Sequence, residues 1–409
     1  MKPVAQQADK MFSLKTIQVD SPLSYFFLAF IAMAGLSYIN FLPGVVNALA
    51  GSIGFSDVEA GQVVALNGYG GIVGSTGAIF LVRRIHWQHG LLACLATLVL
   101  LDLGTVWVDG YSFMLIWRFL AGVLGGLCMG IAFSVLARLN NPDRAFGLLL
   151  FVQFSIGSLV IYLLPGLESR LGAYTVFYVM VSFTSLSLLF LLFLPALPLN
   201  NKSSQKSVSL SGLFGNTLLL LLAIVLYQIA ASAIWAYVGL IGQHSGIATQ
   251  EVSMYVATTG LLGLLGAMLP VLSGNRLGRL YWVIAGTSFS IIASVLLCFS
   301  QSTSLYVISM ALLFFSWPAV QSYLLAATAE MDASGRLSTI AAVVSSLGMA
   351  SGPLLASGLL DNKNFSVMLT TCAVIFFLSL LLLFKPIRAQ EKVDSTNTKS
   401  TGLLQTELV

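Results

Sequence analysis

Residues 64–74 read VALNGYGGIVG, and residues 256–266 read VATTGLLGLLG. The two stretches share a Val-Ala pair followed by three glycines at three-residue spacing, and they align at an offset of 192 residues without a gap. The same offset relates Glu59 to Glu251, Arg84 to Arg276 and Arg144 to Arg336. Glycines three residues apart lie near one face of a helix and let a neighbouring backbone approach closely. The pattern therefore predicts a helical chain built from two copies of one unit.

The composition around these stretches is that of a membrane protein. Hydrophobic residues make up 57% of the 409 residues and charged residues only 8%, against about 25% charged residues in a typical soluble protein. So little charge excludes a soluble surface, and so many apolar side chains exclude a disordered chain. The cysteines stand in apolar stretches without CxxC spacing, which indicates neither a disulfide framework nor a zinc site. They are Cys94, Cys128, Cys298 and Cys372.

Twelve segments are long and apolar enough to cross the hydrocarbon core, which takes a helix of about 20 residues. They lie at residues 24–49, 58–82, 89–108, 111–137, 144–166, 172–196, 213–241, 250–272, 280–300, 303–329, 336–360 and 365–386. Six spans separate the two repeat copies, so the copies have the same orientation. The sequence therefore predicts an all-α membrane protein of two parallel six-helix bundles. Parallel repeats are typical of transporters whose substrate site lies between the repeats near the bilayer midplane.

Lys and Arg indicate the orientation, because loops rich in them tend to stay cytoplasmic. All but three of the 19 Lys and Arg residues fall in the two terminal segments or in loops on the same side. The exceptions are Arg170 and Lys363 in loops of the other side and Arg118 inside a span. We therefore expect both termini to be cytoplasmic. The first apolar run is too long for a signal peptide and no organelle address is evident, so we expect a multi-pass protein of the plasma membrane or bacterial inner membrane.

The polar connections divide the chain into four parts. We expect an N-terminal six-helix bundle with a short cytoplasmic N-terminus over residues 1–197, a flexible cytoplasmic linker over 198–212, a C-terminal six-helix bundle over 213–388 and a disordered cytoplasmic tail over 389–409. The soluble segments are too short for a catalytic domain and carry no nucleophile elbow, phosphate loop or dinucleotide fingerprint. We expect neither an enzyme nor an ATP-driven pump.

Local motifs resemble those of the major facilitator superfamily. Arg118 is followed by Gly122, Gly125 and Gly126, which resembles the family's fourth-helix pattern. Residues 274–279, GNRLGR, resemble its cytoplasmic D-R-x-G-R loop with an amide in the acid's place, and the first-half copy at residues 83–87 keeps only one basic position. The resemblance implies two halves that rock against each other. It also implies a gating-loop role for Arg83, Arg84, Asn275, Arg276 and Arg279.

Two charged residues lie well inside the predicted spans, where charge is costly and marks candidate functional positions. Asp102 and Arg118 both lie about 9–11 Å below the outer ends of consecutive antiparallel helices, at a rise of about 1.5 Å per residue. The structural interpretation is an ion pair between them. In the functional interpretation Arg118 binds a substrate carboxylate or phosphate, and Asp102 is the candidate proton-coupling residue. Ser56-x-x-Glu59 is a capping-box pattern, so we expect Glu59 to cap a helix.

The resemblance also implies that the first, fourth, seventh and tenth spans line the substrate cavity. Polar and aromatic residues near the middles of these spans are therefore candidate substrate-binding residues, with simple packing as the alternative for the aromatic ones. Amides in a bilayer core need partners, which a substrate or a neighbouring helix can supply. Besides Arg118, the candidates are Tyr38, Asn40, Gln228, Trp235, Trp317 and Gln321.

These observations favour a secondary transporter that moves a small organic solute, anionic in our first interpretation, by alternating access, with protons as a candidate coupling ion. Two alternatives stay open: an exporter of lipophilic cations, and a sensor that uses the same fold without transport. A G-P-x-x-G-G signature, typical of drug antiporters, is absent between Gln153 and Gly166. His86 and His89 have metal-pair spacing but no Cys or carboxylate nearby, so we expect no metal and no other cofactor. We expect a monomer in the lipid bilayer that binds no nucleic acid.

Overall fold

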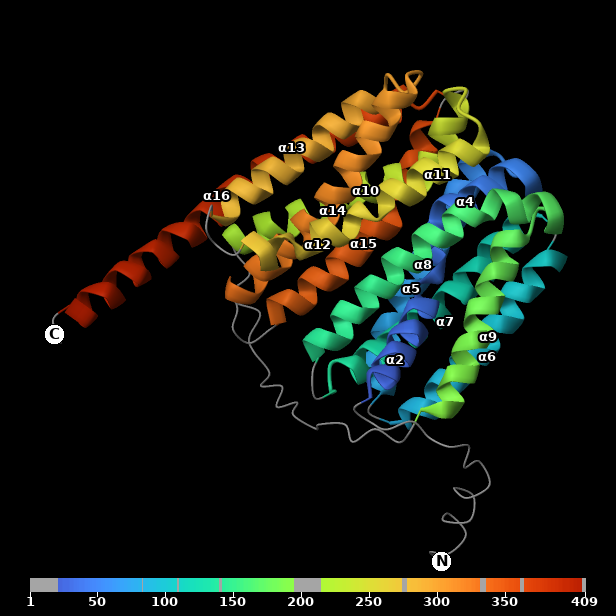
Figure 1. The fold of residues 1–409 in the computed structure, drawn as a ribbon, viewed down its shortest axis with the longest axis horizontal. Helices are drawn as coiled ribbons and strands as arrows, with labels where there is room; N and C mark the ends of the chain where they lie inside the picture. The colour runs from blue at the N-terminus through green and yellow to red at the C-terminus, as the bar shows by residue number, and fades with distance from the viewer. Residues whose placement is uncertain are drawn as a thin grey trace, which may run out of the picture. The chain divides into compact units, whose positions relative to one another are not determined.

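The computed structural model describes residues 21–82, 84–108, 110–139, 142–194, 215–273, 278–331, 336–360 and 364–406. Within these ranges the regular structure is helical throughout (Figure 1). The predicted linker at 198–212 and the gating-loop candidates Arg83, Asn275 and Arg276 lie outside the described residues.

The helices of the first half of the chain are α2 (Pro22–Gly35), α3 (Ser37–Asn40), α4 (Leu42–Asn47), η1 (Ala48–Ile53), α5 (Asp57–Leu81), α6 (Trp87–Gly104), η2 (Thr105–Trp107), α7 (Tyr111–Leu136), α8 (Pro142–Leu171) and α9 (Thr175–Phe193). Those of the second half are α10 (Asn216–His244), α11 (Thr249–Gly260), α12 (Leu262–Ser273), α13 (Arg279–Leu297), α14 (Thr303–Met331), α15 (Arg336–Leu359) and α16 (Ser366–Thr406).

Eleven helices of the described residues are long and apolar enough to cross a membrane, and two short apolar segments, Pro22–Gly35 and Leu42–Ile53, occupy the predicted first span. Together they account for the twelve predicted spans. The third and fourth spans, the hardest to separate in the sequence, are distinct helices at Trp87–Trp107 and Tyr111–Leu136. The prediction of an all-α, multi-pass membrane fold is confirmed.

The first span is not the single helix that its hydropathy suggests. It breaks at Leu36 and again at Phe41, and it ends in the π-helix η1. The second break precedes Pro43, which has no N–H to donate and whose ring clashes with the carbonyl of the residue four positions back. Gly54, with φ of 98°, then ends η1 in the left-handed region. Hydropathy reports only that a segment is apolar, so neither break was predicted.

By internal contacts the described chain forms two compact units. Unit 1 comprises Met1–Phe41, Gly70–Gly157 and Tyr174–Ser204, and unit 2 comprises Leu42–Tyr69, Ser158–Ala173 and Gln205–Val409. Within unit 2, α4 packs on α10, and the hydroxyl of Tyr237 donates to the carbonyl of Asp57 at the start of α5 (2.7 Å). These contacts place parts of the first, second and fifth spans with the C-terminal helices. The division at 197 and 213 therefore stays a prediction from the sequence.

The glycines of the repeat are packing positions. In unit 1, a Cβ added to Gly74 would lie 2.8 Å from the backbone N of Leu127, so α5 and α7 approach to backbone contact. In unit 2, a Cβ on Gly68 would lie 2.8 Å from Cβ of Ala350, and one on Gly260 would lie 3.2 Å from Oγ of Ser158. Ser158 and Ala350 are themselves 192 residues apart. The repeat seen in the sequence is thus reproduced as two equivalent helix contacts.

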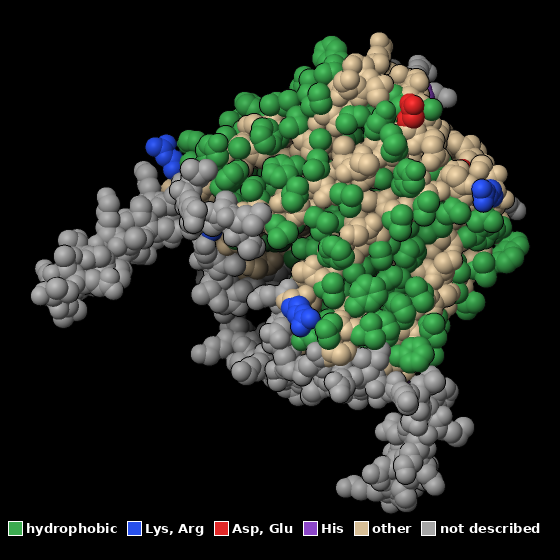
Figure 2. Space-filling view, in the orientation of Figure 1, with side chains coloured by type: hydrophobic (Ala, Val, Ile, Leu, Met, Phe, Trp, Pro, Cys, Tyr) green, Lys and Arg blue, Asp and Glu red, His purple; other side chains and the backbone are tan. Residues whose placement is uncertain are grey.

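Hydrophobic side chains are spread over the whole described part of the face seen in Figure 2, and charged side chains are few there. Large apolar side chains such as Phe80, Leu100 and Trp107 are well exposed on the helices. Such surfaces suit contact with lipid acyl chains, because the same exposure in water would promote aggregation.

Candidate functional site

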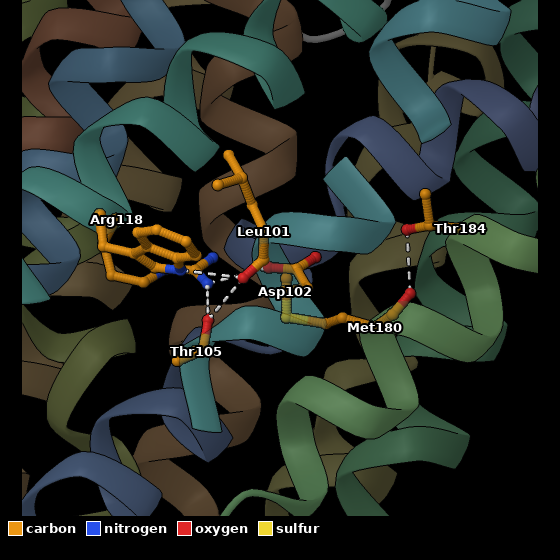
Figure 3. Close-up of polar contacts among 7 residues, drawn as sticks. Leu101, Asp102, Thr105, Arg118, Met180 and Thr184 are labelled. Carbon is orange, nitrogen blue, oxygen red and sulfur yellow. Dashed lines mark hydrogen bonds and ion pairs between the residues drawn. The ribbon is translucent and has the colours of Figure 1, made fainter. Parts of the chain in front are cut away.

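The first polar cluster lies in unit 1, around the ion pair that the sequence predicts. Nη1 of Arg118 donates to Oδ1 of Asp102 at 2.9 Å and to Oγ1 of Thr105 at 3.0 Å (Figure 3). Asp102 and Thr105 are three residues apart, so they present their oxygens on one face of the end of α6 and the start of η2. The predicted pairing of Asp102 with Arg118 is confirmed.

Aromatic rings enclose the guanidinium of Arg118. Its Cζ lies 4.8 Å from the ring centroid of Tyr38 in α3 and 5.0 Å from that of Phe177 in α9. Such cation–π contacts strengthen as water is excluded, and both members of the ion pair are almost completely buried. Arg118 is therefore held by charge, hydrogen bonds and two ring contacts, all from unit 1.

Some polar atoms of this cluster are left over. Oδ2 of Asp102 and Nδ2 of Asn40 are buried and have no hydrogen-bond partner among the described residues. Asn40 ends the short helix α3, directly before the second break in the first span. A buried polar group without a partner costs about 1–3 kcal/mol. Oδ2 of Asp102 is therefore a position for a proton or a hydrogen-bond donor, and Nδ2 of Asn40 is a position for an acceptor such as water or a solute oxygen.

The second polar cluster lies in unit 2 and joins three of the predicted residues through a fourth. The indole N–H of Trp317 donates to Oε1 of Gln228 at 2.6 Å. Nε2 of Gln228 donates to Oγ of Ser345 at 2.7 Å, and Nε2 of Gln321 donates to the same oxygen at 2.9 Å. Gln228 comes from α10, Trp317 and Gln321 from successive turns of α14, and Ser345 from α15. We call these four residues the amide cluster.

Two glycines bring α15 close enough to α10 to complete the amide cluster. A Cβ on Gly348 would lie 2.6 Å from the carbonyl O of Val225 and 2.9 Å from Cβ of Gln228. One on Gly352 would lie 2.5 Å from the carbonyl O of Ile229. Ser345 is one turn before Gly348 and so shares its face of α15. The Gly348-x-x-x-Gly352 motif therefore acts through close helix packing.

The remaining candidates have other surroundings. Trp235 packs edge-on against Phe314, with ring centroids 5.2 Å apart. Of the gating-loop candidates, Arg84 is exposed and Arg279 is buried at the start of α13. The capping box is confirmed: the backbone N–H of Glu59 donates to Oγ of Ser56 (3.2 Å), and the backbone N–H of Ser56 donates to Oε2 of Glu59 (2.9 Å).

Sequence reasoning missed Thr105, Phe177 and Ser345. Serine and threonine in membrane helices commonly bond to a carbonyl of their own helix, so nothing in the pattern singles out the few that bond across helices. Phe177 is one of 26 phenylalanines. Its role depends on where α9 packs, which the sequence alone does not specify.

Comparisons with known proteins agree on the fold. The sequence model of the Major Facilitator Superfamily matches residues 25–331 and, in an overlapping match, residues 220–407. No curated protein matches the chain in sequence. Among solved structures, a mutant of the nucleoside transporter NupG is 14% identical to this chain and superposes with a TM-score of 0.70. The match covers 90% of this chain and 98% of that chain.

Two other solved structures are similar. A D-xylose-proton symporter is 16% identical with a TM-score of 0.71, covering 89% of this chain and 97% of its own. A bacterial homologue of the human lysosomal transporter Spinster, in an inward-facing and unoccupied conformation, is 13% identical with a TM-score of 0.63, covering 90% and 96%. At these identities the structures establish the shared fold.

Proposed function

Because the chain belongs to the major facilitator superfamily, whose members are secondary transporters and not enzymes, we propose that it moves a small polar organic solute across the membrane by alternating access. The observation that carries this proposal is the amide cluster. Lipid supplies no hydrogen bonds, so amides are retained inside an apolar bundle only where other groups bind them. In the amide cluster one acceptor, Oε1 of Gln321, is buried and has no partner among the described residues.

The surroundings of Arg118 argue against the anion-binding role that we expected from the sequence. Its guanidinium already binds Asp102 and Thr105, and rings of Tyr38 and Phe177 lie close to it. An anion would have to displace the carboxylate of Asp102 and leave that charge buried without a partner, which costs about 3–5 kcal/mol. We therefore assign Arg118 to holding Asp102, and not to binding the solute.

The same ion pair argues against the export of lipophilic cations. Such an exporter needs an unneutralised acid deep in the membrane, and Asp102 is the only carboxylate placed deeply in the described spans. With Arg118 2.9 Å away, the pair carries no net charge. Cation binding at Asp102 would require that Arg118 first move away from it.

We propose that proton coupling acts at Asp102. Protonation of this carboxylate would remove its charge and release Arg118, so the two states of the pair differ in the contacts that hold α6 to α7. The unpartnered Oδ2 offers the proton a place without breaking a hydrogen bond. We also propose that both termini of the chain are cytoplasmic.

Transport is tested with the purified protein in liposomes. We expect saturable uptake of a radiolabelled polar solute into liposomes that contain the protein, and none into empty liposomes. A Trp317→Leu variant should lose most of this uptake. An imposed pH gradient should accelerate uptake by the natural sequence and leave an Asp102→Asn/Arg118→Gln double variant unaffected. If no solute from a panel of sugars, nucleosides, amino acids, organic acids and lipophilic cations crosses the membrane through the protein, the proposed function is wrong.

A further inference from the structure

We infer that the amide cluster recognises an uncharged solute that carries hydroxyl or amide groups, with Ser345 and Gln321 as the two residues that contact it. This inference rests on the proposed transport function and specifies its substrate class. Its basis is the hydrogen bonds of the amide cluster, each of which assigns one donor and one acceptor.

Both polar atoms of the Gln228 side chain already have a partner inside the amide cluster. Its Oε1 accepts from the indole of Trp317, and its Nε2 donates to Ser345. The residue is 2% exposed. Gln228 is therefore a positioning residue, which fixes the plane of Trp317 from one side and the hydroxyl of Ser345 from the other.

Ser345 keeps an unused O–H donor, and Gln321 keeps an unused acceptor oxygen. Oγ of Ser345 accepts from two amide N–H groups, so both of its lone pairs are occupied and its own O–H remains to donate. Nε2 of Gln321 donates to Ser345, while Oε1 of Gln321 is buried and accepts from none of the described residues. The O–H of Ser345 and Oε1 of Gln321 are thus an unused donor and an unused acceptor on side chains that are bonded to each other.

A solute hydroxyl fits this arrangement, because a hydroxyl both donates and accepts. It would accept from the O–H of Ser345 and donate to Oε1 of Gln321. A primary or secondary amide can satisfy the same pair. A carboxylate only accepts, so it would face Oε1 of Gln321 with repulsion between two oxygens. An ammonium only donates, so it would leave the O–H of Ser345 unpaired.

The charge distribution favours the same class. The helices that supply the amide cluster carry no Asp, Glu, Lys or Arg over Asn216–His244, Thr303–Thr328 and Ile340–Leu359. A charged solute bound there would lose its hydration without meeting an opposite charge, and burying an unpaired charge is far more costly than burying a hydroxyl. The flat indole of Trp317, held by Gln228, suits the apolar face of a sugar or nucleobase.

Ser346 offers a matched control for Ser345. It is the next residue on α15, and its hydroxyl donates to the carbonyl of Ala342 in its own helix (3.0 Å). The variants Ser345→Ala and Ser346→Ala remove the same oxygen from adjacent positions. Only the first removes an atom of the amide cluster.

The test combines thermal unfolding of the purified full-length protein with uptake in liposomes. The probes are a pentose, a hexose, a polyol and a nucleoside as uncharged solutes, lactate and benzoate as anions, and tetraphenylphosphonium as a cation. We expect an uncharged probe to raise the melting temperature and to be transported. Ser345→Ala and Gln321→Leu should each raise its half-saturating concentration about tenfold, the effect of one lost hydrogen bond, and Ser346→Ala should leave it unchanged.

Three outcomes would decide against the inference. Uptake of lactate, benzoate or tetraphenylphosphonium alone, equal in Ser345→Ala and the natural sequence, would overturn the substrate class and leave the transport function standing. Equal effects of Ser345→Ala and Ser346→Ala on an uncharged probe would remove Ser345 from the site. Absence of uptake for every probe of all three classes would overturn the proposed function itself. Melting temperatures without solute show that each variant is folded.

Discussion

At the scale of single residues, Arg118 and Asp102 show that charged side chains inside a membrane span are paired with each other. Each alone would be an unpaired buried charge, and together they satisfy each other at 2.9 Å. Breaking a buried pair by removing one partner is strongly destabilising, whereas removing both charges is often close to neutral. The stability of the protein should therefore depend on whether the pair is complete or wholly absent.

We predict that Arg118→Gln destabilises the protein by about 3–5 kcal/mol, because it leaves Asp102 buried without its counter-charge. The double variant Asp102→Asn/Arg118→Gln should recover more than half of that loss, since two amides can hydrogen-bond to each other. Thermal and denaturant unfolding followed by circular dichroism measures both. A double variant that is less stable than Arg118→Gln alone would show that the pair is not the coupled unit described above.

Some residues of the two polar clusters could be predicted from the sequence, and others could not. Asp102 and Arg118 could be paired in advance, because charges are rare in spans and consecutive helices are neighbours. Gln228, Trp317 and Gln321 were predicted as site candidates, and the structure joins all three into one cluster. Ser345 could not be predicted. It is one of many serines in the spans, and its importance arises from the approach of α15 to α10.

At the scale of elements, Gly348 controls that approach. A Cβ at this position would lie 2.6 Å from the carbonyl O of Val225, and backbone on both sides leaves no flexible atom to yield. We predict that Gly348→Ala separates α15 from α10, costs about 1–3 kcal/mol as overpacking does, and weakens solute binding through Ser345.

Gly358 supplies the control for this prediction on the same helix. A Cβ there would meet nothing within 4 Å. Gly358→Ala should leave stability unchanged or raise it by up to about 1 kcal/mol, because alanine has the higher helix propensity. Melting temperatures and solute affinities of the two variants, measured side by side, check both expectations. Equal effects of the two substitutions would refute the packing role of Gly348.

The end of the first span allows a second comparison. Gly54 has φ of 98°, and a Cβ there would contact nothing within 4 Å, so any cost of Gly54→Ala comes from the backbone alone. We predict a loss of about 1–2 kcal/mol for Gly54→Ala and no comparable loss for Gly51→Ala, which also has open space and no positive φ. Unfolding midpoints of the two variants test this, and equal midpoints would contradict it.

The positions of the membrane spans could be predicted from the sequence, and the breaks within a span could not. Twelve apolar segments follow from the requirement that each crosses the same hydrocarbon thickness. The breaks at Leu36 and Phe41 do not change how apolar the first span is, so a hydropathy profile does not reveal them. Pro43 was a visible signal for the second break, since proline seldom continues a helix without disturbing it.

At the scale of the whole molecule, the 192-residue repeat gives two equivalent contacts. Gly68 meets Ala350, and Gly260 meets Ser158, each within unit 2. The sequence predicted the repeat but assigned its glycines no partners. The compact units follow these contacts and divide the first, second and fifth spans at Phe41, Tyr69 and Gly157. Each contact joins a helix of one repeat to a helix of the other, so we propose that alternating access forms and releases both contacts during each cycle.

The most direct test of alternating access is uptake by a variant in which one of these contacts is locked. A Cβ on Gly68 would lie 2.8 Å from Cβ of Ala350, below the roughly 3.5–4.5 Å between the Cβ atoms of a disulfide, so two cysteines here can bond once the helices move slightly apart. We predict that Gly68→Cys/Ala350→Cys forms a disulfide on oxidation, that solute uptake then falls to the level of empty liposomes, and that reduction restores it. Neither single variant should respond to the oxidant. Undiminished uptake by fully cross-linked protein would contradict the account, because transport would then proceed without release of this contact.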